Sequence, residues 1–247
     1  MTAKSVMGKI HSWESMGLVD GPGIRTVVFM QGCRLRCQYC HNPDTWSCEG
    51  GTEQSADDVT ARLERFKPYY GTEGGVTFSG GEPLLQREFL TEVLQKCRNA
   101  GIHTCIDTAG CGTGGYREIL KNTDLVLFDV KHYTDEGYRC ITRHDPQEAL
   151  RFLKTAQEMK VPLWIRHVVV PGLTDSEEHL QGLREYLSTL RGVKHVELLP
   201  YHVLGVPKYQ TMNIEYPLEG VPPQDEEKLI RWQKMMNDDI QKRRDAE

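Results

Sequence analysis

Short apolar runs rich in β-branched residues alternate along this chain with windows of helical periodicity, and this alternation limits the fold more than any other feature. The expected strands are Thr26–Met30, Gly75–Phe78, His103–Ile106, Leu125–Val130, Leu163–Val170 and Lys194–Leu199. Strands that alternate with helices form parallel βαβ units. The sequence therefore predicts an α/β fold built on parallel strands.

Start and stop signals place helices between these strands. The N-terminal signals are Ser55, Asp145-Pro146 and a capping box formed by Thr174 and Glu177. A window at Gln86–Ala100 ends at Gly101, a residue that often terminates helices. We expect further helices at Tyr116–Asn122 and Gln224–Lys242, because their apolar residues share one face.

About six strand–helix units fit into the chain, which has 247 residues. A complete eightfold barrel needs about 250 residues of repeating units, but here the first 25 residues and the stretch after Pro200 lie outside the repeat. We therefore expect an incomplete (β/α)6 TIM-like barrel with outer helices, and a doubly wound open sheet is the alternative. No linker divides the chain, so residues 1–247 are expected to form one domain, with a barrel over about 20–202 and a C-terminal helical extension over 203–247.

Composition excludes several classes of function. A net charge of −5 argues against a nucleic-acid binder. No apolar run approaches the roughly 20 residues that cross a bilayer, and residues 1–8 do not form a secretory signal. We expect a cytoplasmic protein with no membrane partner. Its eight cysteines are then reduced thiols, metal ligands or redox groups rather than a disulfide framework.

Three cysteines follow the first expected strand in the spacing C-x3-C-x2-C, at Cys33, Cys37 and Cys40. Compact runs of this kind hold iron–sulfur clusters, and a 4Fe–4S cube normally takes four thiolates. A missing fourth ligand is typical of catalytic metal sites, which keep one position open. Two alternatives remain: a structural zinc site completed by His41, and a redox dithiol of Cys37 and Cys40. Structural thiols are expected at Cys48, Cys97, Cys105, Cys111 and Cys140.

A competing motif, G-x-G-x-x-G, spans Gly110–Gly115 between an expected strand and an expected helix. With Asp135 about 20 residues further on, it matches the dinucleotide fingerprint and suggests an NAD-dependent oxidoreductase. The helix that follows is short and the unit is the third, and the motif leaves the cysteines unexplained. We interpret it as a flexible loop. A zinc-binding interaction protein is a third candidate.

The cysteine motif, with Tyr39 before its last cysteine, resembles the signature of the radical S-adenosylmethionine (SAM) superfamily. Ser79–Pro83 resembles the second motif of that superfamily. Within it, similarity to the glycyl-radical-enzyme activases covers nearly the whole chain and is carried by Asp20–Arg25, Tyr39–Trp46 and Leu199–His202. Only Cys48 lies between Cys40 and Cys97, so a ferredoxin-like insertion is absent, which favours the short type that acts on pyruvate formate-lyase.

The resemblance implies a mechanism. Cys33, Cys37 and Cys40 would ligate three irons of a 4Fe–4S cluster, and SAM would chelate the fourth. The reduced cluster would cleave SAM to methionine and a 5′-deoxyadenosyl radical, which takes a hydrogen atom from a glycine of pyruvate formate-lyase; a different glycyl radical enzyme is the alternative target. A flavodoxin or ferredoxin is the implied electron donor, and a monomer is the implied state.

The resemblance also assigns further site residues. The implied SAM contacts are Tyr39, Cys40, His41, Gly80, Gly81, Glu82, Asp129, Val130, Lys131, Arg166 and His202. A monovalent-cation site is implied at Asp107, Thr108 and Asp129, although Ala109 follows where relatives often have Asn or Ser. Asp20 is expected either to contact the substrate glycine loop or to be a turn residue.

Residue chemistry alone gives other interpretations at some of these positions. As a bare sequence pair, Asp129 and Lys131 indicate a surface ion pair. Arg166 interrupts an apolar strand, which predicts a buried ion pair or a carboxylate contact. The candidate residues nevertheless follow or close separate strands, as Cys33, Gly81 and His202 do. This pattern predicts one shared site at the carboxyl mouth of a barrel.

Overall fold

Eight strands form one sheet in the computed structural model, which describes residues 5–246. Their bounds are β1 (Met7–Gly17), β2 (Arg25–Met30), β3 (Thr52–Ser55), β4 (Gly75–Gly80), β5 (His103–Thr108), β6 (Leu125–Asp129), β7 (Leu163–Val169) and β8 (Val193–Pro200). The strand order is β3-β1-β2-β4-β5-β6-β7-β8. From β2 to β8 every neighbouring pair is parallel, so all six predicted strands are confirmed.

The order of the parallel strands follows the order of the chain without a reversal. Right-handed crossovers between successive strands then place their helices on one face of the sheet, as in a barrel. A doubly wound sheet needs a point at which the strand order reverses, so that alternative was wrong. The sheet ends in two edges, β3 and β8, and the predicted incomplete barrel is confirmed.

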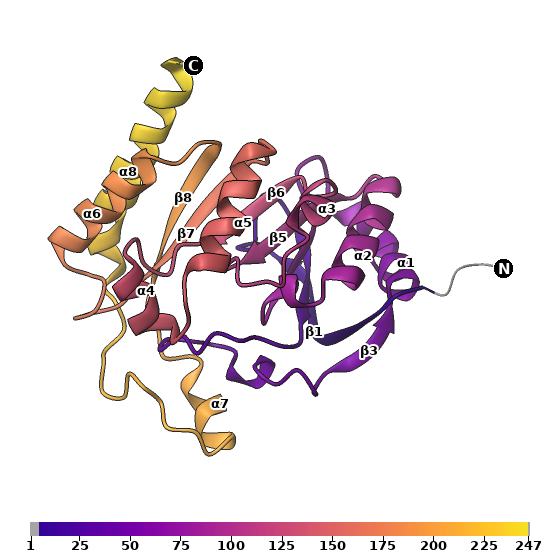
Figure 1. Ribbon diagram of the computed structural model, residues 1–247, viewed down its shortest axis with the longest axis horizontal. Helices are drawn as coiled ribbons and strands as arrows, with labels where there is room; N and C mark the ends of the chain where they lie inside the picture. The colour runs from indigo at the N-terminus through magenta and orange to yellow at the C-terminus, as the bar shows by residue number, and fades with distance from the viewer. Residues whose placement is uncertain (1–4, 247) are drawn as a thin grey trace.

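Helices cover the outside of the sheet, except the short helix Val206–Thr211, which lies apart from it (Figure 1). Their bounds are α1 (Ala56–Phe66), α2 (Arg87–Asn99), α3 (Tyr116–Leu120), α4 (Asp135–Thr142), α5 (Gln147–Glu158), α6 (Glu177–Ser188), α7 (Val206–Thr211) and α8 (Glu226–Ala246), with short 3-10 helices η1 (Pro43–Thr45), η2 (Lys67–Tyr69) and η3 (Pro83–Leu85). Neighbours pack in sequence, α1 on α2 and α2 on α3, and α8 lies along β8. No helix within residues 5–246 is long and apolar enough to cross a membrane.

The structure adds elements that the sequence pattern did not predict. Strand β1 pairs antiparallel with both β2 and β3 and extends the sheet beyond the first parallel strand. Its apolar signal is weak because Ile10 is its only fully buried large side chain. Helices α4 and α7 were also missed, since each has only two turns or fewer.

Two cap predictions had different outcomes. Ser55 caps α1, because its hydroxyl accepts from the Asp58 N–H at 3.0 Å. The capping box that starts at Thr174 was wrong. Ser176 caps α6 instead, and its Oγ accepts from the His179 N–H at 3.0 Å. The Thr174 hydroxyl donates to the Val168 carbonyl, near the end of β7.

A fully buried arginine, Arg25, fixes the amino end of the first parallel strand. Its guanidinium donates to the Thr77 hydroxyl and the Val76 carbonyl, both at 2.6 Å, and to the Pro22 carbonyl at 3.1 Å. These partners are neutral oxygens rather than a carboxylate, and burial lowers the pKa of Arg25. Hydrogen bonds to these neutral oxygens therefore offset the free-energy cost of burying the charged guanidinium.

Replacing Arg25 by Met should destabilise the fold strongly, because two carbonyls and the Thr77 hydroxyl lose a donor at once. We expect a loss of about 3 kcal/mol or more in the free energy of unfolding, measured by urea denaturation under anaerobic conditions. The matched control is Arg65→Met on α1, where the side chain is exposed and the change should stay within about 0.5 kcal/mol. Equal losses in the two variants would contradict this role of Arg25.

Candidate active site

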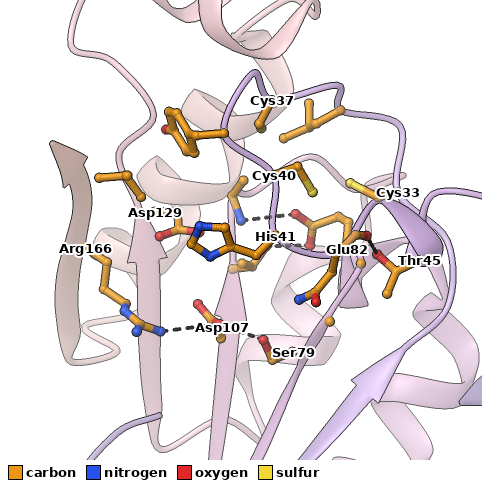
Figure 2. Close-up of a pocket in the computed structure, with 18 of the residues that line it drawn as sticks. Cys33, Cys37, Cys40, His41, Thr45, Ser79, Glu82, Asp107, Asp129 and Arg166 are labelled. Atoms are coloured by element: carbon orange, nitrogen blue, oxygen red, sulfur yellow. Dashed lines mark hydrogen bonds and ion pairs between the residues drawn. The ribbon is translucent and has the colours of Figure 1, made fainter. Parts of the chain in front are cut away.

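The carboxyl ends of the parallel strands surround a cavity of about 470 Å³ (Figure 2). The predicted residues that line it are Asp20, Cys33, Cys37, Tyr39, Cys40, His41, Gly80, Gly81, Glu82, Asp107, Thr108, Asp129, Lys131, Arg166 and His202. Val130 is the one predicted site residue that does not line it. The predicted residues at the ends of separate strands therefore converge on one cavity.

The loop that carries Cys33, Cys37 and Cys40 has no regular secondary structure. It is held in place by hydrogen bonds to two helices. On one side the Arg36 N–H donates to the Thr142 carbonyl at 2.8 Å, at the end of α4. On the other side the Tyr209 hydroxyl, on α7, donates to the Cys40 carbonyl at 3.0 Å. The two helices that the sequence pattern missed thus clamp the cysteine loop.

The three thiols of the C-x3-C-x2-C motif line one cavity. All eight cysteines of the chain are free, and these three face one cavity (Figure 2). Within residues 5–246 no three His, Cys, Asp or Glu groups gather around one point, as a zinc ion would require. An iron–sulfur cube takes each thiolate on a separate iron, so its ligands lie further apart. Burial raises the pKa of Cys37 to about 12, and a bound cationic centre is what would make such a thiol ionise.

The His41 ring packs against the His202 ring. The two rings stack with centroids 3.9 Å apart at 25°. Burial lowers the pKa of His41 to about 4, so the ring is neutral. This geometry does not support a zinc site completed by His41, and it gives the cavity a flat aromatic wall.

No side chain fits at Gly80 or Gly81, because the backbone at each position lies directly against backbone from another segment. Gly80 has φ +103°, and a Cβ there would overlap the amide nitrogen of Met30. A Cβ on Gly81 would overlap the carbonyl of Gly32, just before the first cysteine. The pair lets the end of β4 lie directly against the chain that enters the cysteine loop.

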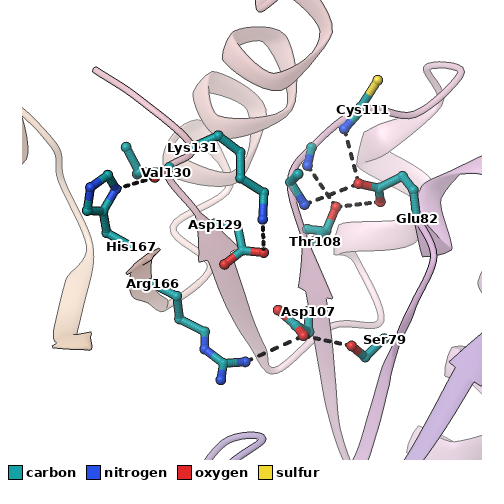
Figure 3. A network of polar contacts seen from close by, with 12 residues as sticks. Ser79, Glu82, Asp107, Thr108, Cys111, Asp129, Val130, Lys131, Arg166 and His167 are labelled. Carbon is teal, nitrogen blue, oxygen red and sulfur yellow. Dashed lines mark hydrogen bonds and ion pairs between the residues drawn. The ribbon is translucent and has the colours of Figure 1, made fainter. Parts of the chain in front are cut away.

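The Glu82 carboxylate accepts hydrogen bonds from the end of β5 and from the loop that follows it. It accepts from the Thr108 hydroxyl at 2.5 Å, from the Ala109 N–H at 3.1 Å and from the Cys111 N–H at 3.3 Å. The Thr108 hydroxyl also accepts from the Gly110 N–H at 2.8 Å, so it is turned toward Glu82 (Figure 3). Desolvation raises the pKa of Glu82 to about 7. Glu82 therefore fixes the loop after β5.

Arg166 stands among acidic groups at the floor of the cavity (Figure 3). Its guanidinium lies 3.5 Å from the Asp107 carboxylate and 3.3 Å from that of Glu197. The Glu197 contact does not meet hydrogen-bond geometry at Nε, so it is an ion pair only. Ser79 donates to Asp107 at 2.7 Å. The charged residue within an apolar strand thus forms the buried pair that its position predicted.

Asp129 and Lys131 form a second pair, with Lys131 Nζ 2.8 Å from the Asp129 carboxylate. Their side chains are only 22% and 13% exposed. The interpretation as a surface ion pair was therefore wrong. The Lys131 ammonium also lies 5.6 Å from the ring centroid of Tyr39, within the range of a cation–π contact.

Negative charge exceeds positive charge in this part of the molecule. The acidic groups are Asp20, Glu82, Asp107, Asp129 and Glu197, and the cationic groups are Arg166 and Lys131. Burial raises the pKa of Asp107 to about 6 despite Arg166, and its Oδ1 is buried without a hydrogen-bond partner. Uncompensated buried charge is costly, so a cationic ligand would stabilise this site.

Sequence reasoning missed Glu197, although the signal that identified Arg166 was present there. Glu197 interrupts an apolar run on β8, just as Arg166 does on β7, and the two residues are register partners in the parallel ladder. A charge in each of two adjacent strands would have predicted the pair.

Comparison with known proteins gives consistent matches. The profile of the radical SAM superfamily matches residues 27–183. The pyruvate formate-lyase-activating enzyme of Clostridium pasteurianum is 56% identical over 234 residues, which cover 94% of this chain and 98% of that protein. The enzyme of that name from Listeria monocytogenes is 45% identical over 239 residues, covering 94% and 96%. A crystal structure of a domain of such an enzyme from Bacteroides vulgatus aligns with a TM-score of 0.54 at 27% identity, over 67% of this chain and 94% of that one.

The raised pKa of Glu82 predicts a specific pH dependence of stability. Because its folded pKa, about 7, exceeds the usual 4.5, the folded chain binds this proton more tightly than the unfolded chain. The resulting stabilisation, roughly 3 kcal/mol, is fully present below about pH 4.5 and is lost as the pH rises through 7. Glu82→Gln should remove this part of the slope in urea unfolding measured from pH 4.5 to 8.

The control is Glu118→Gln, at an exposed position on α3. This variant should keep the pH profile of the unaltered protein. Parallel profiles for Glu82→Gln and the unaltered protein would show that the proton on Glu82 does not contribute.

Proposed function

We propose that this chain, which belongs to the radical SAM superfamily and within it to the family of the pyruvate formate-lyase-activating enzymes, generates the glycyl radical of pyruvate formate-lyase. When bound, a reduced 4Fe–4S cluster supplies the electron that splits SAM into methionine and a 5′-deoxyadenosyl radical, which takes a hydrogen atom from a glycine of the protein substrate. One observation carries the proposal: the three-cysteine loop opens into the same cavity as a buried excess of carboxylates.

Cys33, Cys37 and Cys40 would hold three irons of the cluster. Their loop is held by hydrogen bonds to α4 and α7, which fix the backbone that carries the thiols. The fourth iron would have no protein ligand and would face the cavity, where the amine and carboxylate of SAM can reach it.

The charge of the cavity suits SAM. The ligand carries a sulfonium, an ammonium and a carboxylate, hence one net positive charge. Asp129 and Lys131 offer opposite charges to the ammonium and the carboxylate at the amino-acid end of SAM. The ion pair with Arg166 holds the Asp107 carboxylate in place. The flat wall of His41 and His202 would receive the adenine or ribose.

We extend the proposal to a monovalent cation. Carboxylates outnumber the two cationic groups, Arg166 and Lys131, in this part of the molecule, so the site has room for a cation besides SAM. Asp107 Oδ1 is buried and has no partner, and hard cations prefer such oxygen ligands. Asp107 and Asp129 are the proposed ligands. The Thr108 hydroxyl is bound to Glu82 and would not contribute.

The glycine loop of the protein substrate would enter beside Asp20. The Asp20 carbonyl accepts from the Thr77 hydroxyl at 2.6 Å, which fixes this residue at the edge of the cavity. Its neighbours Leu18 and Val19 are 72% and 70% exposed and offer apolar surface next to the opening. By resemblance we also propose a flavodoxin or ferredoxin as electron donor and a monomeric, single-domain enzyme of the cytoplasm.

Removing one thiol should abolish the cluster without unfolding the chain. After anaerobic reconstitution the unaltered protein should hold about four irons and four sulfides per chain. We expect less than half of this in Cys37→Ala, by iron and acid-labile sulfide analysis. The control is Cys140→Ala, at an exposed position on α4 outside the cavity, which should keep its iron. Zinc without sulfide, or full iron in Cys37→Ala, would contradict the proposed ligands.

Neutralising Asp129 should weaken SAM binding with the cluster intact. Asp129→Asn leaves Lys131 without its carboxylate partner and removes a buried negative charge. We expect the KM for SAM in 5′-deoxyadenosine formation to rise tenfold or more, about 1.5–3 kcal/mol, with iron content unchanged. Asp238→Asn, at an exposed position on α8, is the control. An unchanged KM would remove Asp129 from the site.

A further inference from the structure

Behind the ends of β6 and β7 lies a layer of aromatic rings that no part of the proposed mechanism uses. It consists of His132, Tyr133, His167 and His179, and none of these side chains lines the SAM cavity. His167 is 1% exposed and His179 is 7% exposed. The His167 and His179 rings lie edge to edge, with centroids 5.2 Å apart and planes inclined by 22°, and the His132 ring meets His179 edge-on at 4.8 Å.

Hydrogen bonding fixes the tautomers of the two buried histidines. His167 Nδ1 lies 2.6 Å from the Val130 carbonyl, which can only accept, so Nδ1 carries the proton (Figure 3). Burial lowers the pKa of His167 to about 3 and that of His179 to about 4, so both rings are neutral. His167 Nε2 is then an acceptor, and His179 Nε2, 3.1 Å away, must donate to it. The two rings form a chain of hydrogen bonds that ends at the Val130 carbonyl.

Two glycines in neighbouring helices make room for the layer. A Cβ on Gly137, in α4, would overlap the His132 ring, and a Cβ on Gly182, in α6, would come within 2.5 Å of the Tyr133 hydroxyl. Glycine inside a helix costs about 1 kcal/mol relative to alanine. The fold has glycine at both positions despite this cost, because a side chain at either position would displace a ring of the layer.

The hydrogen-bond chain holds the peptide that lies between two cavity residues. The Val130 N–H donates to the Arg166 carbonyl at 2.9 Å, and its carbonyl accepts from His167. Both groups of Val130 are therefore fixed by β7, one residue beyond the end of β6. The adjacent Asp129 and Lys131 can then direct their paired side chains into the cavity (Figure 3).

We infer that His167 and His179 are positioning residues for SAM, which act through the Val130 carbonyl to set Asp129 and Lys131 against the amino-acid end of the ligand. The inference rests on the proposed function. It assigns to Val130 a role through its backbone, which explains why this residue lies outside the cavity although its neighbours line it.

Paired substitutions at each histidine test the chain of hydrogen bonds. His167→Asn keeps a donor at the place of Nδ1, whereas His167→Leu removes it. His179→Gln keeps a donor at the place of Nε2, whereas His179→Leu removes it. With iron content unchanged, we expect the leucine variants to raise the KM for SAM, about tenfold at His167 and severalfold at His179, with kcat within twofold. The amide variants should stay within twofold of the unaltered enzyme.

Nitrogen-15 NMR of histidine-labelled holoenzyme with an oxidised cluster provides a readout independent of turnover. We expect the proton of His167 on Nδ1 and that of His179 on Nε2. A proton on Nε2 of His167, equal KM values in the leucine and amide variants, or loss of iron in both leucine variants would overturn the inference. If the unaltered enzyme cleaves no SAM while the tautomers are as expected, the proposed function itself fails, and the positioning role fails with it.

Discussion

A surplus of buried negative charge at the carboxyl ends of the parallel strands is the constraint on which the rest of this structure depends. Arg166 and Lys131 compensate only part of it, and Asp107 retains a buried oxygen without a partner. Burying ions costs several kcal/mol each unless they are paired. A cationic ligand with the chemistry of SAM would therefore compensate the remaining negative charge.

The metal-binding loop is held by elements that are distant in the sequence. Cys40 is fixed by Tyr209, and the segment around Cys37 by the end of α4, about 100 residues away. On its inner side the loop rests on Gly81, where no side chain would fit. Because thiolates cannot bind a cube without a defined geometry, the supports from α4 and α7 belong to the site as much as the cysteines do.

Much of this arrangement could be predicted from the sequence, and the reasons for the failures are physical. Parallel strands such as Leu125–Asp129 are buried on both faces and give continuous apolar runs, so they were predicted. Strand β1 buries few large side chains and gives no such run. The directions of Glu82 and Thr108 depend on the loop after β5, and the partial burial of Asp129 depends on the residues that other strands and loops bring to the same cavity. Neither is encoded in local spacing.

Electron paramagnetic resonance on pyruvate formate-lyase tests the central claim most directly. The chain, loaded with its cluster and reduced anaerobically, would be incubated with SAM and pyruvate formate-lyase. We predict a glycyl radical signal on the lyase that requires SAM and disappears when Cys37→Ala replaces the unaltered chain. A radical that forms without SAM or survives that substitution would contradict the assignment, as would the absence of a radical when the cluster is intact and SAM is cleaved.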